Sequence, residues 1–252
     1  MKLLTVARDL KRRKAREKRS LFVAEGTRAV EELLKSGLSL EGAIISPALE
    51  QSTRGASLIA ELARRGVETV EASEPDFASA ADTDSPQGVL AVARVPQQSL
   101  DTITKREMFR IVVLDAVQDP GNAGTILRTA AALGAAATIA LPGSVDLWNA
   151  KVVRSSMGAQ FTHPAVSMST EDFANLLRRE AIELWAADAA GEKLGGMVPP
   201  RRLAVAVGNE GAGLSAPVRG LASRIVGLPI TEGVESLNVA VATGIILYEL
   251  GK

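Results

Sequence analysis

The 252-residue chain contains no cysteine, one histidine and few aromatic residues, namely two Trp, one Tyr and five Phe. Without cysteine it can form no disulfide, thiolate nucleophile or zinc–thiolate site, and we expect no metal site. The scarcity of aromatic rings also argues against binding single-stranded nucleic acid on stacking platforms. Because hydrophobic residues still make up 46% of the chain, the core must be built from Ala, Val, Leu and Ile.

Long apolar runs are missing as well. No stretch approaches the length of about 18 apolar residues that indicates a membrane helix. The first residues also lack the apolar segment of a signal peptide. The sequence therefore predicts a cytoplasmic protein without a membrane contact.

The formal net charge is zero, but the charges are unevenly distributed. Residues 1–20 hold nine Lys and Arg against two acidic residues, a net charge of +7, so the remainder carries −7. This basic segment is either a solvated helix face or an arm that contacts phosphates. Its candidate RNA-binding side chains are Arg12, Arg13, Lys14, Arg16, Lys18 and Arg19.

Short apolar runs alternate with helical segments, which predicts an α/β architecture. We expect a first α/β domain over 1–95, with the basic segment as its arm, then a polar linker over 96–108. A second domain over 109–252 begins with a buried strand at 110–115. Its alternating strands and helices predict parallel pairing with right-handed crossovers.

The loop 119-DPGNAG-124 follows that buried strand and leads into a helix that carries Arg128. A guanidinium is always charged, and we expect this one to be buried beside a core, where it needs an anionic or polar partner. Gly121 and Gly124 fall close to Arg128 on a helical wheel, which leaves room for a ligand, and Asn122 caps the helix or holds that ligand. The alternative is an ordinary strand–turn–helix with a snorkelling arginine.

Two further loops follow strands of the second domain, and ligands of parallel sheets bind at such carboxyl ends. In 208-GNEGAGL-214, the glycines let backbone amides approach a planar ligand, and Glu210 is free to point inward. Ser236 and Asn238 each suit a cap of the last helix. Arg154 and Ser156, in 151-KVVRSSMGA-159, suit a phosphate, a ribose or a helix cap. The glycine spacing matches neither a dinucleotide nor a triphosphate motif.

Taken together, these segments resemble the SpoU (TrmH-type) family of RNA ribose 2′-O-methyltransferases of the SPOUT superfamily. The resemblance rests on 115-DAVQDPGNAGTILRTAAALGA-135, 151-KVVRSSMGA-159, 207-VGNEGAGL-214 and 228-LPITEGVESLNVAVATGIILYE-249. The segments 20-SLFVAEGTRAVEELL-34 and 84-DSPQGVLAVA-93 are similar to the RNA-binding α/β domain that often precedes this fold.

The resemblance implies a parallel sheet with a C-terminal trefoil knot whose loops bind S-adenosylmethionine. It assigns the cofactor to Gly208, Leu228 and Leu237, and we add Gly211, Gly213, Ser236 and Asn238. It makes Arg128 the catalytic residue. Because arginine does not deprotonate, we expect it to hold the ribose 2′-oxygen and a phosphate rather than act as a base. Asn122, Glu210, Ser156 and Asn238 complete the predicted catalytic group.

The resemblance also implies a homodimer through the C-terminal domain, with Arg154 near its interface. Arg154 is therefore a candidate for binding RNA or for reaching the other subunit's site. Ribosomal RNA is the expected substrate. The alternatives are a transfer RNA methyltransferase, a non-catalytic RNA-binding protein of this fold, and a small-molecule enzyme that leaves the basic segment unexplained. No motif surrounds His163, so we expect it to be structural.

Overall fold

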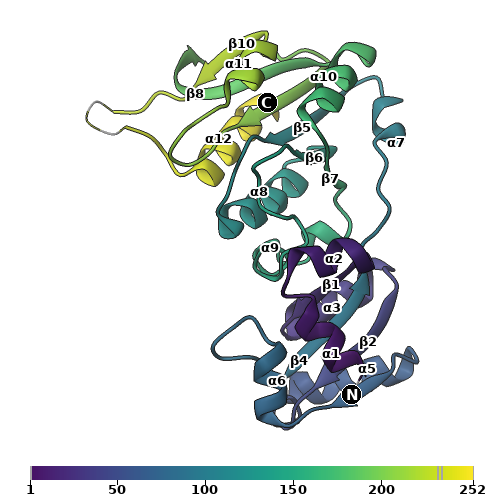
Figure 1. Ribbon diagram of the computed structural model, residues 1–252. Coiled ribbons are helices and arrows are strands. Elements are labelled where there is room, and N and C mark those ends of the chain that lie inside the picture. The colour runs from purple at the N-terminus through teal and green to yellow at the C-terminus, as the bar shows by residue number, and fades with distance from the viewer. Residues whose placement is uncertain (1, 232, 234, 252) are drawn as a thin grey trace. The chain divides into compact units, whose positions relative to one another are not determined.

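A computed structural model describes residues 2–231, 233 and 235–251 (Figure 1). The chain divides into two compact units. The first comprises Met1–Gln97 and Trp148–Thr162, and the second comprises Gln98–Leu147 and His163–Lys252. The boundaries expected at 95/96 and 108/109 stay predictions.

The first unit contains a mixed four-stranded sheet in the order β1-β4-β2-β3. Strand β4 pairs antiparallel with both β1 and β2, whereas β3 runs parallel to β2. The strands are β1 (Leu21–Glu25), β2 (Leu40–Ile45), β3 (Thr69–Glu71) and β4 (Val89–Arg94).

The basic segment at the start of the chain is folded rather than a free arm. It forms two helices, and its apolar side chains Leu4, Ala7 and Leu10 are buried in one cluster with Phe77 and Leu90. The helices of this unit are α1 (Lys2–Asp9), α2 (Arg13–Arg19), α3 (Thr27–Ser36), α4 (Pro47–Glu50), α5 (Thr53–Arg64), α6 (Glu74–Ala80), α9 (Ala150–Ser155) and the 3₁₀ turn η1 (Ala159–Phe161).

The segment Trp148–Thr162 joins this unit through aromatic packing. The ring centroid of Phe22 in β1 lies 4.5 Å from that of Trp148 and 5.8 Å from that of Phe161. Aromatic pairs at such distances add to the stabilisation from buried area. A segment that we expected in the second domain therefore makes its packing contacts with the first unit.

The second unit contains a six-stranded sheet in the order β10-β8-β9-β5-β6-β7, and every pairing in it is parallel. The predicted parallel α/β architecture is confirmed. The strands are β5 (Phe109–Leu114), β6 (Ala137–Ala140), β7 (Ala165–Ser167), β8 (Glu183–Lys193), β9 (Arg202–Val207) and β10 (Arg224–Gly227). The trefoil knot stays an expectation from the family resemblance.

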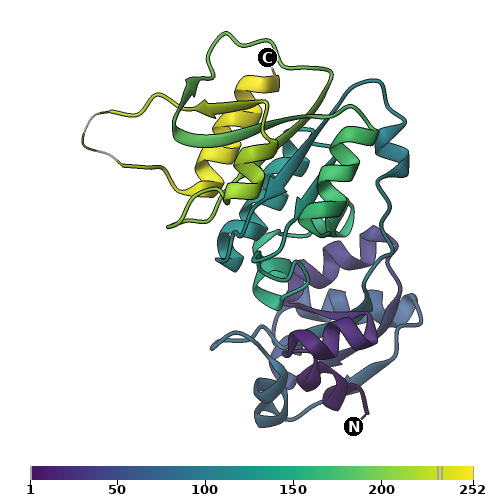
Figure 2. The ribbon, with the colours of Figure 1, turned by 45° about the horizontal axis from the view of Figure 1, so that its top comes forward.

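Helices cover both faces of this sheet, as the burial of both faces of a parallel sheet requires. One core holds Ile111, Phe173 and Val218, from β5, α10 and α11. A second core holds Val205 and Ile246, from β9 and α12, and α12 packs on α8 and runs alongside the sheet (Figure 2). The helices are α7 (Asp101–Thr104), α8 (Pro120–Ala132), α10 (Thr170–Arg179), α11 (Ala216–Leu221) and α12 (Val239–Gly251).

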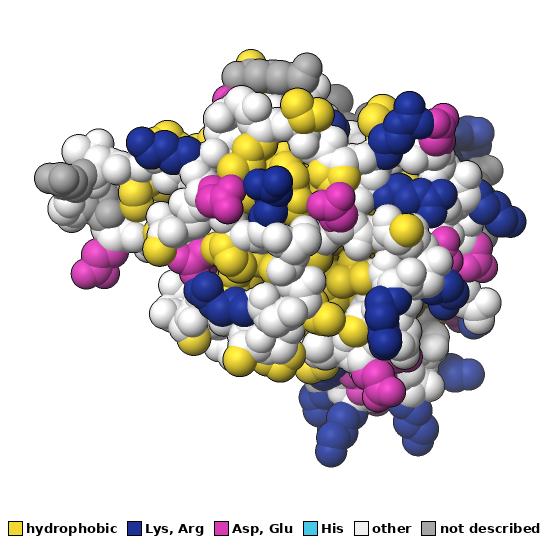
Figure 3. Space-filling view, turned by 90° about the horizontal axis from the view of Figure 1, so that it is seen from above, with side chains coloured by type: hydrophobic (Ala, Val, Ile, Leu, Met, Phe, Trp, Pro, Cys, Tyr) yellow, Lys and Arg dark blue, Asp and Glu magenta, His cyan; other side chains and the backbone are white. Residues whose placement is uncertain are grey.

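On the face seen in Figure 3, hydrophobic side chains gather in the middle, and Lys and Arg with some Asp and Glu lie around them. Many arginines are paired, for example Arg8 with Asp76 and Arg54 with Glu31. Within the described residues, no helix is long and apolar enough to cross a membrane.

Candidate active site

Arg128 lies on the exposed side of α8, so the expectation that its guanidinium is buried was wrong. The helix buries Ile126 and Leu127 and turns Thr125 and Arg128 outward. Among the residues that the structure describes, Arg128 makes no hydrogen bond or ion pair. Its fork is therefore hydrated and available to an incoming anion, and its charge causes no burial penalty.

Asn122, Glu210 and Asn238, which are far apart in the sequence, form one chain of hydrogen bonds. The Asn122 Nδ2 donates to Glu210 Oε1 over 3.0 Å, and the Asn238 Nδ2 donates to Asn122 Oδ1 over 2.9 Å. The Asn238 Oδ1 accepts the backbone amides of Ala240 and Val241, which caps the start of α12. This chain fixes two helix starts and the 208–215 loop relative to one another.

Glu210 is held as a carboxylate by the same contacts. Burial alone raises its pKa, but hydrogen bonds outweigh that effect and leave the pKa below its ordinary value. The donors are the Asn122 side chain at 3.0 Å and the amides of Gln118 at 3.3 Å and Asp119 at 3.2 Å. Glu210 is thus charged at neutral pH and serves as the anionic anchor of the loop before α8.

The loop after β9 depends on Gly208 for its shape. A Cβ added at this position would lie 2.3 Å from the carbonyl carbon of Gly213, a distance that real Cβ atoms do not show. Asn209, which the sequence analysis missed, donates to the carbonyl of Ala116 and accepts the amides of Gly211 and Ala212. An Asn between glycines is the signal that could have revealed it.

These loops enclose an open cavity of about 500 Å³ at the carboxyl ends of β9 and β10. This volume falls in the range of small-molecule sites, about 300–1,000 Å³. Glu210 lines the cavity, and so do all of the predicted cofactor residues: Gly208, Gly211, Gly213, Leu228, Ser236, Leu237 and Asn238. Arg128 and Asn122 are not among the lining residues.

The cavity also has a wall that the sequence did not reveal. The register between β8 and β10 shifts between Ile225 and Val226, so residues 187–191 of β8 bulge outward, and Asp188 lines the cavity. Asp188 accepts the amide of Ala190 and pairs with Arg219 of α11. A Cβ on Gly227 would lie 2.8 Å from the Asp188 carbonyl oxygen, so glycine allows the bulge to close on β10.

Two other predicted site residues lie in the first unit. Ser156 is fully buried, and its hydroxyl donates to the Val153 carbonyl over 2.8 Å, so it closes α9. Arg154 faces Asp82, with 3.3 Å between its Nη1 and the carboxylate. The structure does not bring either side chain to the cavity, and their roles at the active site stay predictions.

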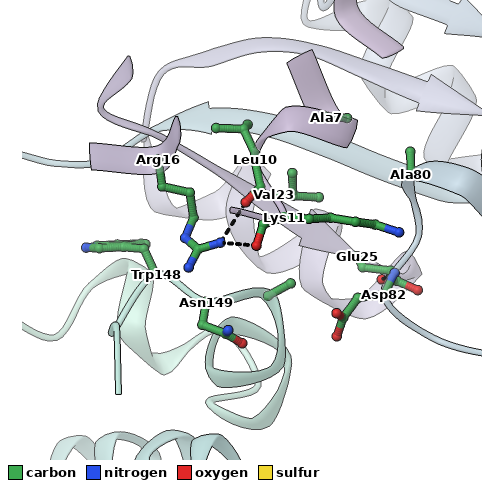
Figure 4. A pocket seen from close by; sticks show the side chains of 11 residues that line it. Ala7, Leu10, Lys11, Arg16, Val23, Glu25, Ala80, Asp82, Trp148 and Asn149 are labelled. Atoms are coloured by element: carbon green, nitrogen blue, oxygen red, sulfur yellow. Dashed lines mark hydrogen bonds between the residues drawn. The ribbon is translucent and has the colours of Figure 1, made fainter. Parts of the chain in front are cut away.

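The arginines of α2 and Arg12, which precedes the helix, are paired or buried. Arg12 and Arg19 both contact Asp9, and Arg13 contacts Glu17. Arg16 is buried, and its Nη1 donates to the carbonyls of Leu10 at 2.6 Å and Lys11 at 2.9 Å (Figure 4). Its position is that of a structural residue that links α1 to α2, whereas Lys14 and Lys18 are exposed.

His163 lies in the core of the second unit. Its Nε2 is 2.9 Å from the Thr138 hydroxyl, and burial lowers its pKa from 6.5 to about 4. The ring is therefore neutral at physiological pH. Its position agrees with a structural role, as expected.

The fold and the cavity together define a class: an α/β protein with a ligand pocket at the carboxyl edge of a parallel sheet. Comparison with known proteins narrows this class. Residues 110–248 match the model of the SpoU rRNA Methylase family, and residues 5–91 match the MRM3-like substrate binding domain. The chain belongs to the SpoU rRNA methylase family.

Relatives and solved structures support this membership over nearly the whole chain. The 23S rRNA (guanosine(2553)-2′-O)-methyltransferase RlmP of Bacillus subtilis (strain 168) is 33% identical, over 96% of this chain and 93% of the relative. An AdoMet-bound rRNA methyltransferase from Sinorhizobium meliloti is 31% identical with a TM-score of 0.84, over 98% of this chain and 93% of the other. The SpoU methyltransferase AviRb of Streptomyces viridochromogenes, in complex with AdoMet, is 30% identical with a TM-score of 0.85, over 99% of this chain and 96% of the other.

Proposed function

We propose that this protein transfers a methyl group from S-adenosylmethionine to a ribose 2′-hydroxyl of ribosomal RNA. The observation that carries the proposal is the glycine-walled cavity, which the Glu210–Asn122–Asn238 chain links to the start of the Arg128 helix. Relatives with this fold are named as 23S rRNA 2′-O-methyltransferases. The expected cytoplasmic location stays a prediction of the sequence.

The residues around the cavity fit the cofactor. Its lining combines backbone of Gly208, Gly211 and Gly213 with apolar Leu228 and polar edges, the mixture that suits a nucleoside with an amino-acid tail. The seven predicted cofactor residues would hold it. When bound, S-adenosylmethionine supplies an electrophilic methyl group on a sulfonium.

Arg128 would act on the RNA. Its exposed fork has no partner within the described chain, so it can bind a phosphate and the neighbouring 2′-oxygen together. Because its charge is permanent, it stabilises the alkoxide that develops as the hydroxyl loses its proton. The proton passes to a phosphate oxygen or to water. Asn122 and Glu210 hold the start of α8 and so set the direction of this helix.

We also propose a homodimer through α12. Its exposed hydrophobic side chains Val241, Ile245 and Tyr248 recur at helical spacing and form one stripe, with exposed fractions of 40–58%. Leu237, which is 37% exposed, lies just before the helix. An exposed apolar stripe of this kind marks a protein contact. The identical stripe of a second copy is a self-complementary partner for a two-fold interface.

The dimer would also complete the active site. Arg128 does not line the cavity of its own chain. The Arg128 of the second subunit would therefore hold the RNA beside the cofactor that the first subunit binds. Mixed dimers test this sharing. Pairing Arg128→Ala subunits with Gly208→Val subunits should recover part of the methyl transfer, because one of the two composite sites is intact. Mixed dimers as inactive as the two parents would contradict a shared site.

The direct test of the activity is methyl transfer to RNA. The protein is incubated with labelled S-adenosylmethionine and either transcribed bacterial 23S rRNA or total tRNA, and the methylated ribose is mapped. We expect label on a 2′-oxygen in 23S rRNA. Label in tRNA alone would correct the substrate class, and label on a base, or no transfer, would contradict the proposed function.

A further inference from the structure

A second cavity, of about 290 Å³, opens within the first unit. It lies between the start of α3, the loop 82–88 and the end of α9, and three arginines line it: Arg28, Arg54 and Arg154. Each side chain and loop belongs to the first unit, so the cavity is defined without reference to the second.

The loop on one side of this cavity is held firmly. The Glu25 carboxylate accepts the amides of Asp82, at 2.7 Å, and Thr83, at 3.3 Å, and also the Thr83 hydroxyl. The Gln87 Oε1 accepts the amide of Thr27 at 3.0 Å and its hydroxyl at 3.1 Å. The start of α3 is therefore already capped, and Glu25, the carboxylate in the lining, is already supplied with donors.

The polar side-chain groups of this cavity that do not hold the loop are hydrogen-bond donors. Arg28 is exposed, and within the described part of the chain it forms no hydrogen bond or ion pair. The Ser85 hydroxyl is likewise without a described partner, and the side-chain amide nitrogen of Gln87 is not used by the contacts that hold the loop. Each of these groups can donate to a ligand, and Arg28 adds a permanent charge.

The other two arginines of the cavity already contact carboxylates, so Arg28 differs from them in having all of its donors available. Arg54 binds Glu31 with two bonds, of 2.8 and 2.6 Å, and Arg154 lies 3.3 Å from Asp82. Both side chains also line the cavity, and their remaining N–H groups can donate to a ligand. A ligand rich in acceptor oxygens and negatively charged would satisfy these donors.

We infer that this cavity binds the sugar–phosphate backbone of the substrate RNA, with Arg28 on a phosphate and Ser85 and Gln87 on neighbouring oxygens. The inference rests on the proposed function, because it takes the substrate to be RNA. It adds an RNA contact outside α2, whose arginines are paired or buried and whose exposed charges are Lys14 and Lys18.

The test compares Arg28→Ala with Arg64→Ala. Arg64 is an exposed arginine of the same unit, 69% exposed and paired with Glu61, so the control removes the same charge elsewhere. Binding to transcribed bacterial 23S rRNA is measured across a salt series. Arg28→Ala should weaken RNA binding by about tenfold, as expected for one charged hydrogen-bonding contact. The salt dependence should fall by about 0.7–0.9 in slope.

Arg64→Ala should match the wild type in both respects. Affinity for S-adenosylhomocysteine should be the same in all three proteins. Arg28→Lys, which keeps the charge without the fork, should restore the salt slope and part of the affinity, and it serves if the alanine variant fails to fold. Equal RNA affinity and salt slope for Arg28→Ala, Arg28→Lys and wild type would overturn the inference.

The two proposals fail separately. If wild-type protein methylates 23S rRNA but Arg28→Ala behaves as Arg64→Ala does, the cavity does not contact RNA and the activity stands. If wild-type protein neither methylates nor binds RNA, both proposals are contradicted.

Discussion

Two arginine-bearing helices of this protein behave in opposite ways. The sequence of α2 is dense in positive charge, yet its arginines are paired with Asp9 and Glu17 or, for Arg16, buried on backbone carbonyls. Helix α8 carries one arginine, and that side chain is exposed without a described partner. The number of charges in a segment therefore does not show which side chain has all of its donors free; the contacts show it.

Replacing the free arginine should have the largest effect. Arg128→Ala should lower turnover by about 100- to 1,000-fold, the range expected when a group that stabilises transition-state charge is lost. The affinity for S-adenosylmethionine should change less than twofold, because Arg128 does not line the cavity. Single-turnover rates and calorimetry give the two quantities. If cofactor affinity collapsed together with turnover, Arg128 would belong to the cofactor site.

Changing the wall of the cavity should instead weaken the binding of the cofactor. Gly208→Ala places a Cβ 2.3 Å from the Gly213 backbone, so the loop must shift, and S-adenosylmethionine should bind at least about tenfold more weakly. Gly220→Ala in α11 is the control, because a Cβ there would meet no atom within 4 Å. Equal cofactor affinity in the two variants, measured by calorimetry, would mean that this loop does not form the site.

The buried arginine of α2, Arg16, should affect the stability of the fold rather than RNA binding. Arg16→Ala leaves the carbonyls of Leu10 and Lys11 without their donor, and the free energy of unfolding should fall by about 1–3 kcal/mol. Lys14→Ala, an exposed neighbour, should change it by less than about 0.5 kcal/mol. Denaturant titration measures both. Arg16→Ala with unchanged stability and weaker RNA binding would restore α2 as the RNA contact.

The last effect appears only in acid, as a pH dependence from the buried histidine. Because burial lowers the pKa of His163 to about 4, its neutral form favours folding. This contribution is complete above pH of about 6.5 and is lost as the pH falls to about 4, by up to about 3 kcal/mol. His163→Gln should flatten this part of the stability profile and leave turnover nearly unchanged. Parallel profiles for variant and wild type would contradict the assignment.

Much of the fold could be predicted from periodicity and turn residues. Ala137–Ala140 and Leu203 to Val207 are short apolar runs between turns, and both are strands of the parallel sheet. The docking of α1 could not be predicted, because Leu4, Ala7 and Leu10 are sparse among charges and their burial depends on a distant core. For the same reason nothing local indicated that Trp148 packs on Phe22.

The candidate site was predictable where a motif carries it and unpredictable where tertiary contacts make it. The spacing of Gly208, Gly211 and Gly213 indicated a close backbone approach, and the three residues line one cavity. The Asp188 bulge arises from a register shift between β8 and β10, which no local pattern encodes. The exposure of Arg128 was mispredicted because its apolar neighbours face the core on the other side of the helix.

The central claim is that the glycine-walled cavity of the second unit is the cofactor site. A crystal structure of the protein with S-adenosylhomocysteine tests it most directly. We predict that the ligand lies against Gly208, Leu228 and Leu237, with the Glu210–Asn122–Asn238 hydrogen bonds preserved. A ligand bound elsewhere on the chain, or a cavity that stays empty at saturating concentration, would contradict the account.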